Sequence, residues 1–415
     1  MHIAYIHYLF GRDTAFQHVR QFADGARALG HRVDVHAGNL APASTNSGSG
    51  GGRPPLTSRF RAWAKRHFGR YLHDPKEFYW NARYIPRETA LLRTGNRPDV
   101  LLVRSQGLSI SAPIVARRLD LPLVLEINGP LEELAKYRSE YVNWLTLRRW
   151  CGRYKRRRAQ AITVVSGALA AHFADDGVAS DKLFVVPNGA DIDVFHPGIE
   201  PDSETLERLG ATAGSETNHG SKTVIGYVGS FQPWHDMDRL ARLVTTVASQ
   251  RDATCFLFVG AGSGMETLRD ALAPLGERVL FTGRVPHERV PALVACLDIG
   301  VLAEAAWYQC PLKVLEWMAA GRAIVAPGHG PLGELMRDGE EGLLFPPGND
   351  EAMVETVLDL VDDPERRRAL GAAAAERART SLTWQDNARR VVDACQHAID
   401  RHRAAKSEST KLNKS

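Results

Sequence analysis

Short apolar runs alternate with longer amphipathic stretches along most of the chain. Runs such as 100–103 and 123–127 are rich in Val, Leu and Ile, which is typical of strands covered on both faces of a parallel sheet. The alternation predicts doubly wound α/β sheets with right-handed crossovers. The predicted strands are 2–7, 33–37, 100–103, 123–127, 161–165 and 183–186 in the first half, and 224–228, 255–259, 279–282, 299–302, 323–326 and 342–345 in the second.

Two series of strands predict two Rossmann-like domains, and 415 residues exceed one ordinary core. A polar stretch without strand character separates the series. In such sheets ligands bind beyond the carboxyl ends of the strands, so two facing domains place the site in the cleft between them. We expect an N-terminal domain over 1–197, a linker over 198–221, a second domain over 222–380, a helix over 381–402 that packs back toward the N-terminal domain, and a disordered tail over 403–415.

Composition adds few constraints outside two unusual segments. Residues of about 41–58 are rich in Ser, Gly and Pro, which predicts a disordered insert. Residues 59–72 are basic and aromatic without an acidic residue, which fits either a helix on an anionic membrane or an ordinary surface helix. The net charge of +4 gives no basis for a nucleic-acid partner. With no long apolar run and no signal-peptide pattern, we expect a cytoplasmic protein, and the membrane alternative for 59–72 would place it at the inner face of the membrane.

The stretch 308–325 carries the strongest chemical signal. Lys313 and Glu316 are three residues apart on one face of a predicted helix. A helix N-terminus beside a lysine is a seat for phosphate, and a nearby carboxylate accepts hydrogen bonds from sugar hydroxyls. Lysine at a helix start opposes the helix dipole, which favours an anion nearby over the alternative of a plain surface lysine. The pattern suggests a nucleotide-sugar donor.

Several ordered motifs resemble those of the family-4 glycosyltransferases, which have the GT-B fold. Each motif is weak alone, but their order and spacing are specific and cover nearly the whole chain. The resemblance implies two facing Rossmann-like domains and transfer of a sugar, with retention, from a nucleoside diphosphate to a hydroxyl. The motifs lie at 28–33, 163–166, 186–191, 195–197, 226–231, 234–235, 259–264, 281–285 and 308–321.

The chain departs from the family pattern where the donor diphosphate is usually held. Ser230 stands in place of an arginine, His235 in place of a lysine, and Tyr308 in place of the first of two glutamates. Some family members share the Trp-His and Pro-Leu-Lys variant of this chain. The resemblance to that variant implies that Lys313 is the phosphate partner. We interpret Lys313 as replacing the lost charge. His235 is expected to contact phosphate or sugar, with capping of the next helix as the alternative.

The resemblance also implies the remaining donor contacts. Ser230 and the backbone N–H groups near Leu312 and in the loop at Gly11 are expected to face the diphosphate. The base is expected to lie against Arg284, Val285 and the glycine turn at Gly262, and the second family glutamate, at position 316, is expected to bind the ribose.

Candidate acceptor and catalytic residues follow the strand 123–127. Asn128 occupies the position of a family histidine beside the donor sugar. Glu126 points the same way and is a candidate for acceptor contact or for a general base, with a salt bridge to an arginine as the alternative. Asp13 is expected near the acceptor. The predicted catalytic set is Glu126, Asn128, His235 and Lys313.

The expected substrates are a UDP-, GDP- or ADP-sugar and a sugar, lipid-linked or other small acceptor, in polysaccharide or glycolipid synthesis. No cofactor and no metal are expected. Two rivals stay open: a sugar-nucleotide epimerase of the same architecture and a non-catalytic binding subunit. A dinucleotide oxidoreductase is weaker, because residues 1–40 lack a Gly-x-Gly-x-x-Gly turn.

Overall fold

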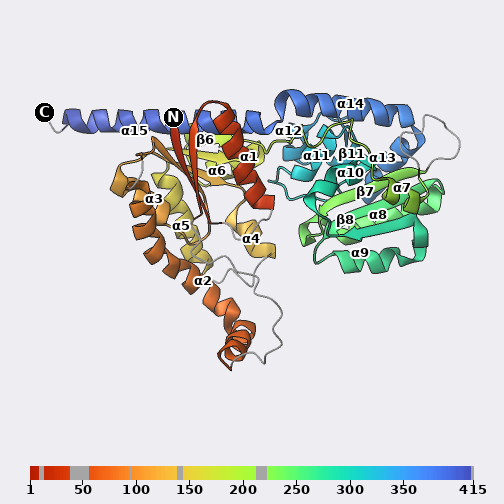
Figure 1. Cartoon of the computed structure of the whole chain (residues 1–415), viewed down its shortest axis with the longest axis horizontal. Helices are drawn as coiled ribbons and strands as arrows, with labels where there is room; N and C mark the ends of the chain where they lie inside the picture. The colour runs from red at the N-terminus through yellow and green to blue at the C-terminus, as the bar shows by residue number, and fades with distance from the viewer. Residues whose placement is uncertain (9–13, 38–55, 94–95, 138–143, 212–221, 413–415) are drawn as a thin grey trace. The chain divides into compact units, whose positions relative to one another are not determined.

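A computed structural model describes residues 1–8, 14–37, 56–93, 96–137, 144–211 and 222–412, with the backbone alone described for 14–16, 56–73, 134, 137 and 411–412. The chain divides into two compact units. Unit 1 comprises Met1–Val164, Leu169–Val186 and Ala388–Ser415, and unit 2 comprises Val165–Ala168 and Pro187–Asn387. Each unit is described by itself (Figure 1).

Unit 1 is built on a six-stranded parallel sheet in the order β2-β1-β3-β4-β5-β6. The order reverses between β1 and β3, which is the switch point of a doubly wound sheet. The predicted strands of the first half are confirmed to within a residue at each end. Their bounds are β1 (His2–His7), β2 (Arg32–Ala37), β3 (Val100–Arg104), β4 (Leu123–Ile127), β5 (Ala161–Val164) and β6 (Leu183–Val185).

Helices connect these strands and carry the chain across the sheet. The long α2 contains two prolines, Pro75 and Pro86. The helix α3 ends at Asp120, whose left-handed backbone (φ 54°) places its N–H on the carbonyls of the last turn. The helices are α1 (Thr14–Ala28), α2 (Leu56–Arg93), α3 (Ser111–Leu119), α4 (Leu131–Tyr137), α5 (Leu145–Arg158) and α6 (Gly167–Asp175).

The C-terminal helix α15 (Trp384–Leu412) completes the core of unit 1. Its buried positions recur every three or four residues, as expected for one apolar face of a helix. They pack with residues of β1, β3 and α1, including Ile3, Tyr5 and Phe22. The buried residues of α15 in this cluster are Ala388, Val391, Ala394, Cys395, Ala398 and Ile399.

Unit 2 contains the second six-stranded parallel sheet, in the order β12-β11-β10-β7-β8-β9. Its switch point lies between β7 and β10. The predicted strands of the second half are confirmed to within two residues. They are β7 (Thr223–Ser230), β8 (Thr254–Ala261), β9 (Val279–Gly283), β10 (Ile299–Val301), β11 (Ala323–Pro327) and β12 (Leu343–Phe345).

The helices of unit 2 flank this sheet, and α11 packs against α14 (Figure 1). Asp236 caps the start of α8, because its side chain accepts a hydrogen bond from the N–H of Arg239 at 3.0 Å. The helices are α7 (Ser203–Leu209), α8 (Met237–Gln250), α9 (Met265–Leu272), α10 (Val290–Ala295), α11 (Leu312–Ala319), α12 (Gly330–Leu335), α13 (Asp350–Asp362) and α14 (Pro364–Ser381).

The observed limits differ from the predicted organisation at three places. The contiguous part of unit 1 ends at Val186 rather than at 197. The stretch expected to be a linker contains α7, which is capped by Asp202. The tail expected to be disordered from 403 continues α15 to Leu412. The insert predicted at 41–58 falls mostly outside the described residues, as do the side chains on which the membrane prediction for 59–72 depends.

Candidate functional site

The predicted donor residues of unit 2 lie at the carboxyl edge of its sheet. Ser230 ends β7, Gly262 follows β8, and Arg284 follows β9. Glu304 follows β10, on the other side of the switch point. Parallel strands end at one edge, so these residues share the part of the sheet where α/β proteins bind ligands.

Lys313 in the first turn of α11 brings a positive charge to this edge. Its Nζ donates to Tyr227 Oη at 2.5 Å and lies 2.9 Å from His235 Nε2. Nζ also lies 4.4 Å from the centroid of the Tyr227 ring, a distance at which a cation is attracted to an aromatic face. Burial lowers the pKa of Lys313 to about 7, and Glu316 opposes that shift. The ammonium is therefore partly desolvated and easily discharged before any anion binds.

His235, in the short helical turn Pro233–His235, is a neutral acceptor in this arrangement. Its Nδ1 lies 3.2 Å from the carbonyl oxygen of Glu304, so the proton belongs on Nδ1 and the Nε2 lone pair faces Lys313. Burial and then the charge of Lys313 lower the pKa of His235 to about 3. The structure thus gives His235 an accepting contact to Lys313, whereas the sequence suggested a donor to phosphate or sugar.

A polar network fixes the loop that His235 touches. The Glu304 carboxylate accepts from Arg239 Nη1 at 2.9 Å and pairs with His329 Nε2 at 2.7 Å. Arg239 also donates to Asp350 at the start of α13. The residue whose carbonyl orients the His235 ring is therefore held by contacts to two other segments of unit 2, and Asp350 in turn holds Arg239.

Glu316 lies one turn after Lys313, and its half-buried carboxylate has no side-chain hydrogen bond to the described residues. Burial raises its pKa to about 7; Lys313 lowers it, and Asp191 raises it. The predicted pairing of Lys313 and Glu316 on one turn of α11 is present. A buried carboxylate without a donor is suited to receive hydroxyl groups.

The start of α11 is anchored by the loop before it. Ser166 Oγ donates to the Tyr308 carbonyl at 2.9 Å, and Asn188 Nδ2 donates to the Cys310 carbonyl at 2.8 Å. Pro311 is the N-cap and its side chain caps nothing. The N–H groups of Leu312 and Lys313 belong to the set that a helix leaves unpaired at its start, whereas that of Val314 donates to the Pro311 carbonyl at 3.2 Å.

The remaining donor candidates make no hydrogen bond to Lys313 within the described residues. Ser230 is exposed and its carbonyl accepts from Tyr227 Oη at 2.7 Å. A Cβ at Gly262 would lie 2.3 Å from the Phe231 carbonyl oxygen, so this turn requires glycine for a close approach of two loops. Arg284 is exposed, and the next residue, Val285, is half-buried at the end of β9.

The acceptor candidate Glu126 of unit 1 forms a buried ion pair with Arg104. Arg104 Nη1 and Tyr5 Oη both donate to the Glu126 carboxylate, and His18 Nδ1 lies 3.7 Å from it. Burial favours a raised pKa for Glu126, but the charges of Arg104 and His18 outweigh it and hold the pKa below its usual range. A paired carboxylate of lowered pKa is a weak base, which favours the salt-bridge alternative.

Asn128 follows at the carboxyl end of β4. Its Nδ2 donates to Glu126 at 2.8 Å, and its buried Oδ1 has no partner among the described residues. An unpaired buried oxygen is suited to a ligand hydroxyl. Gly11 and Asp13, the other two candidates of this unit, lie outside the described residues.

The sequence of the chain matches two family models. Residues 15–194 match Glycosyltransferase Family 4, and residues 222–363 match Glycosyl transferases group 1. The chain belongs to the group 1, family 4 type of glycosyltransferase.

Two characterised relatives of this glycosyltransferase illustrate the range of donors and acceptors. The chain is 28% identical over 243 residues to a GDP-mannose-dependent alpha-(1-6)-phosphatidylinositol monomannoside mannosyltransferase of Mycolicibacterium smegmatis. The aligned region covers 57% of this chain and 62% of that protein. The chain is 28% identical over 315 residues to a 2-deoxystreptamine N-acetyl-D-glucosaminyltransferase of Streptomyces fradiae, which covers 71% of this chain and 70% of that protein.

Solved structures share the fold of this glycosyltransferase. The Anabaena protein HepE, solved with UDP, has a TM-score of 0.70 at 17% identity and covers 95% of this chain and 99% of its own. Sucrose-phosphate synthase of Thermosynechococcus elongatus has a TM-score of 0.65 at 18% identity, with coverage of 94% and 97%. The two parallel sheets and this likeness show the GT-B α/β fold.

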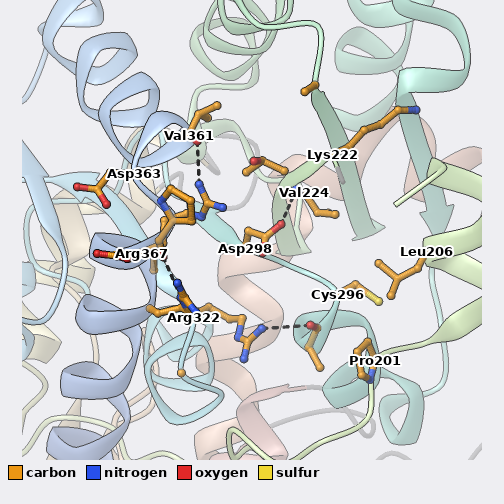
Figure 2. Close-up of a pocket in the computed structure, with 18 of the residues that line it drawn as sticks. Pro201, Leu206, Lys222, Val224, Cys296, Asp298, Arg322, Val361, Asp363 and Arg367 are labelled. Carbon is orange, nitrogen blue, oxygen red and sulfur yellow. Dashed lines mark hydrogen bonds between the residues drawn. The ribbon is translucent and has the colours of Figure 1, made fainter. Parts of the chain in front are cut away.

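A large cavity of this glycosyltransferase lies at the opposite, amino edge of the unit 2 sheet (Figure 2). Its volume is about 1140 Å³, and Val224 and Asp298, at the starts of strands, line it. Two of its arginines donate to neighbouring backbone: Arg367 donates to the Val361 carbonyl at 2.9 Å, and Arg322 donates to carbonyls that precede β10. They cap helix ends, so size alone does not make this cavity the donor site.

Among the described residues, every helix is too short or too polar to span a bilayer. The same residues present no cluster of three or more His, Cys, Asp or Glu side chains arranged to hold a metal ion.

The sequence did not indicate Tyr227 or Glu304 as parts of the site. Tyr227 is in a motif in which only Ser230 was singled out, and its partner Lys313 is 86 residues away. Glu304 comes just after a buried strand, at the edge where ligands bind, and that position was the available signal.

Proposed function

We propose that the protein transfers a sugar from a nucleoside diphosphate to an acceptor hydroxyl, with retention at the anomeric carbon. The observation that carries the proposal is the Lys313 ammonium at the carboxyl edge of unit 2. Two of its three N–H donors are used by Tyr227 and His235, which leaves one for a phosphate oxygen.

The chemistry needs stabilisation of the leaving diphosphate. Negative charge grows on that group as the glycosidic bond breaks, and fixed donors stabilise it best in a site from which water is excluded. Lys313 supplies a charge, and the unpaired N–H groups at the start of α11 supply dipoles. The anion in turn favours the protonated lysine, whose pKa of about 7 in the free protein would rise on binding.

Glu316 is proposed to accept hydrogen bonds from the ribose hydroxyls. Its half-buried carboxylate lacks another partner among the described residues and lies one turn from Lys313. The base is proposed to lie toward the ends of β8 and β9, where Gly262 permits the close approach of two loops and Val285 is half-buried.

The acceptor is proposed to be a hydroxyl-rich ring, free or carried by a lipid. Support comes from relatives named for phosphatidylinositol mannoside, 2-deoxystreptamine and inositol phosphate acceptors. For a retaining transfer we propose that the leaving phosphate takes the acceptor proton on the same face. Asn128 is proposed to bind a sugar hydroxyl through its unpaired Oδ1, with Glu126 holding the amide in place.

Proton NMR of the anomeric signals tests the proposal. UDP-, GDP- and ADP-sugars are each incubated with sugar and cyclitol acceptors. We expect one donor to be consumed only with acceptor, giving a product of unchanged anomeric configuration. We expect Lys313→Met to lower kcat/KM at least about tenfold, because a charged hydrogen bond is lost.

The matched control is Lys222→Met, since Lys222 is half-buried at the amino edge of the same sheet and donates to the Leu209 carbonyl. Interconversion of donor sugars without acceptor would instead indicate an epimerase. Binding without turnover of any donor would indicate a binding subunit.

Peripheral membrane contact through residues 59–72 stays a prediction, as does a cytoplasmic location. Sedimentation with liposomes that contain anionic lipid tests the former, with the chain compared with and without that segment. Equal sedimentation of the two would exclude the contact.

A further inference from the structure

Tyr227 on β7 contacts Lys313 in two ways, through its hydroxyl and through its ring face. It is buried, with 1% of its surface exposed. Its ring meets the His235 ring edge-on at a centroid distance of 5.8 Å and the Trp317 ring at 6.4 Å. The ring is therefore fixed by the same two segments, the turn before α8 and the helix α11, that carry the site.

The hydroxyl of Tyr227 has a defined direction. It donates to the Ser230 carbonyl at 2.7 Å, so its lone pairs face Lys313, which donates to it at 2.5 Å. The lysine thus meets Tyr227 through a hydroxyl oxygen and through the ring face, at 4.4 Å from the centroid. Both contacts favour the charged form of the amine.

Gly229 makes room for this arrangement. Tyr227 and Gly229 point to the same side of β7, because side chains alternate along a strand. A Cβ at Gly229 would lie 2.9 Å from Lys313 Cε, and the backbone there has φ +146°, which side-chain-bearing residues rarely adopt. The Lys313 side chain therefore packs along Gly229, which has no Cβ to obstruct it, and its ammonium contacts Tyr227 of the same strand.

We infer that Tyr227 is a positioning residue that holds the Lys313 ammonium at the carboxyl end of β7 for the donor diphosphate. The inference rests on the proposed function. It assigns Tyr227 no contact with substrate: the hydroxyl acts through Lys313, and the donor meets the lysine. The titratable groups that face Lys313 are Tyr227, His235 and Glu316. Burial keeps His235 and Tyr227 neutral near pH 7, and Glu316, whose pKa burial raises to about 7, is about half charged there.

Nucleotide titrations of Tyr227→Phe and Tyr227→Leu between pH 6 and pH 9 test the inference, with the nucleoside diphosphate that the wild-type protein binds. We expect Tyr227→Phe to weaken binding about tenfold at pH 8 and less at pH 6, because the hydroxyl no longer favours the protonated lysine. The pH at which affinity begins to fall should move downward. Tyr227→Leu should weaken binding about threefold more, since the ring face is also lost.

Tyr84→Phe is the control, because it removes a hydroxyl from a buried tyrosine of unit 1. A merely structural tyrosine would lower the melting temperature and leave the pH midpoint of binding unchanged. The inference is overturned if Tyr227→Phe keeps both the affinity and the midpoint while Lys313→Met loses binding; the proposed function then stands. If Lys313→Met also binds normally, the proposed donor site itself fails.

Discussion

Nucleotide binding is expected to be linked to proton uptake by Lys313. Burial lowers the pKa of this lysine to about 7 in the free protein. A bound diphosphate places negative charge against the amine and raises that pKa again. The contribution of Lys313 to affinity should therefore be greatest below pH 7 and fall as the pH rises above it, because protonation of the lysine then has to accompany binding.

The number of protons follows from the free-state pKa. A group of pKa about 7 is about half protonated at pH 7 and about one-tenth protonated at pH 8, so binding should take up about 0.5 and about 0.9 protons respectively. Glu316 acts in the opposite sense: its pKa of about 7 falls when ribose hydroxyls donate to it, which releases a proton. The wild-type value is the sum of the two.

Calorimetry at pH 8 in buffers of different ionisation enthalpy separates these contributions. At this pH the terminal phosphate of a free nucleotide, with a pKa of about 6, is already ionised. Glu316→Gln removes the releasing group, so uptake should approach one proton. In Lys313→Met, whose methionine cannot titrate, uptake should vanish. The reasoning is refuted if Glu316→Gln binds the nucleotide with the same enthalpy in every buffer.

Three further substitutions test parts of the structure, each by urea unfolding. Gly229→Ala should lower the free energy of unfolding by about 1–3 kcal/mol, because the φ of +146° is strained for alanine, whereas Gly333→Ala, with nothing within 4 Å of its new Cβ, should be near neutral. Arg104→Met should cost about 3–5 kcal/mol at pH 7 by leaving the buried Glu126 carboxylate without its cation. The double variant with Glu126→Gln should recover much of that loss. Since Arg104 holds the Glu126 pKa low, the contribution of the pair should be present above the ordinary glutamate pKa and disappear as the pH falls through the folded value. Ala398→Glu should cost at least about 3 kcal/mol, because it buries a charge where α15 packs on unit 1.

The hydrophobic periodicity of the sequence was sufficient to predict the strands of both sheets. Every predicted strand of the two series is present, because buried parallel strands are continuous apolar runs and the helices between them are amphipathic. The turn that carries Lys313 and Glu316 was also predictable, since both residues come from one helix. Local spacing determines such pairs.

Contacts between distant segments were not predictable in this way. The bond between Lys313 and Tyr227 depends on how α11 packs beside β7, and no spacing within either segment reveals it. The tautomer of His235 is determined by a carbonyl 69 residues away. For Glu126 the sequence left open a catalytic role and a salt bridge to an arginine. The partner is Arg104 on the neighbouring strand, and the register of the two strands, which brings these residues together, cannot be read from either strand alone.

The continuation of α15 beyond 402 had a simpler cause. Its last turns are polar, so hydropathy indicated a tail, but His402 and Lys406 both pair with Asp120 in unit 1. These ion pairs, one turn apart, fix the helix against the end of α3. Composition alone does not show a partner of this kind.

The central claim is that a nucleoside diphosphate binds at the carboxyl edge of unit 2 through Lys313. Isothermal titration of UDP, GDP and ADP into the wild type, Lys313→Met and Lys222→Met at pH 7 tests it most directly. We predict that the wild type and Lys222→Met bind the same nucleotide with the same affinity and that Lys313→Met binds it at least about tenfold more weakly. Equal affinity of Lys313→Met and the wild type would contradict the account.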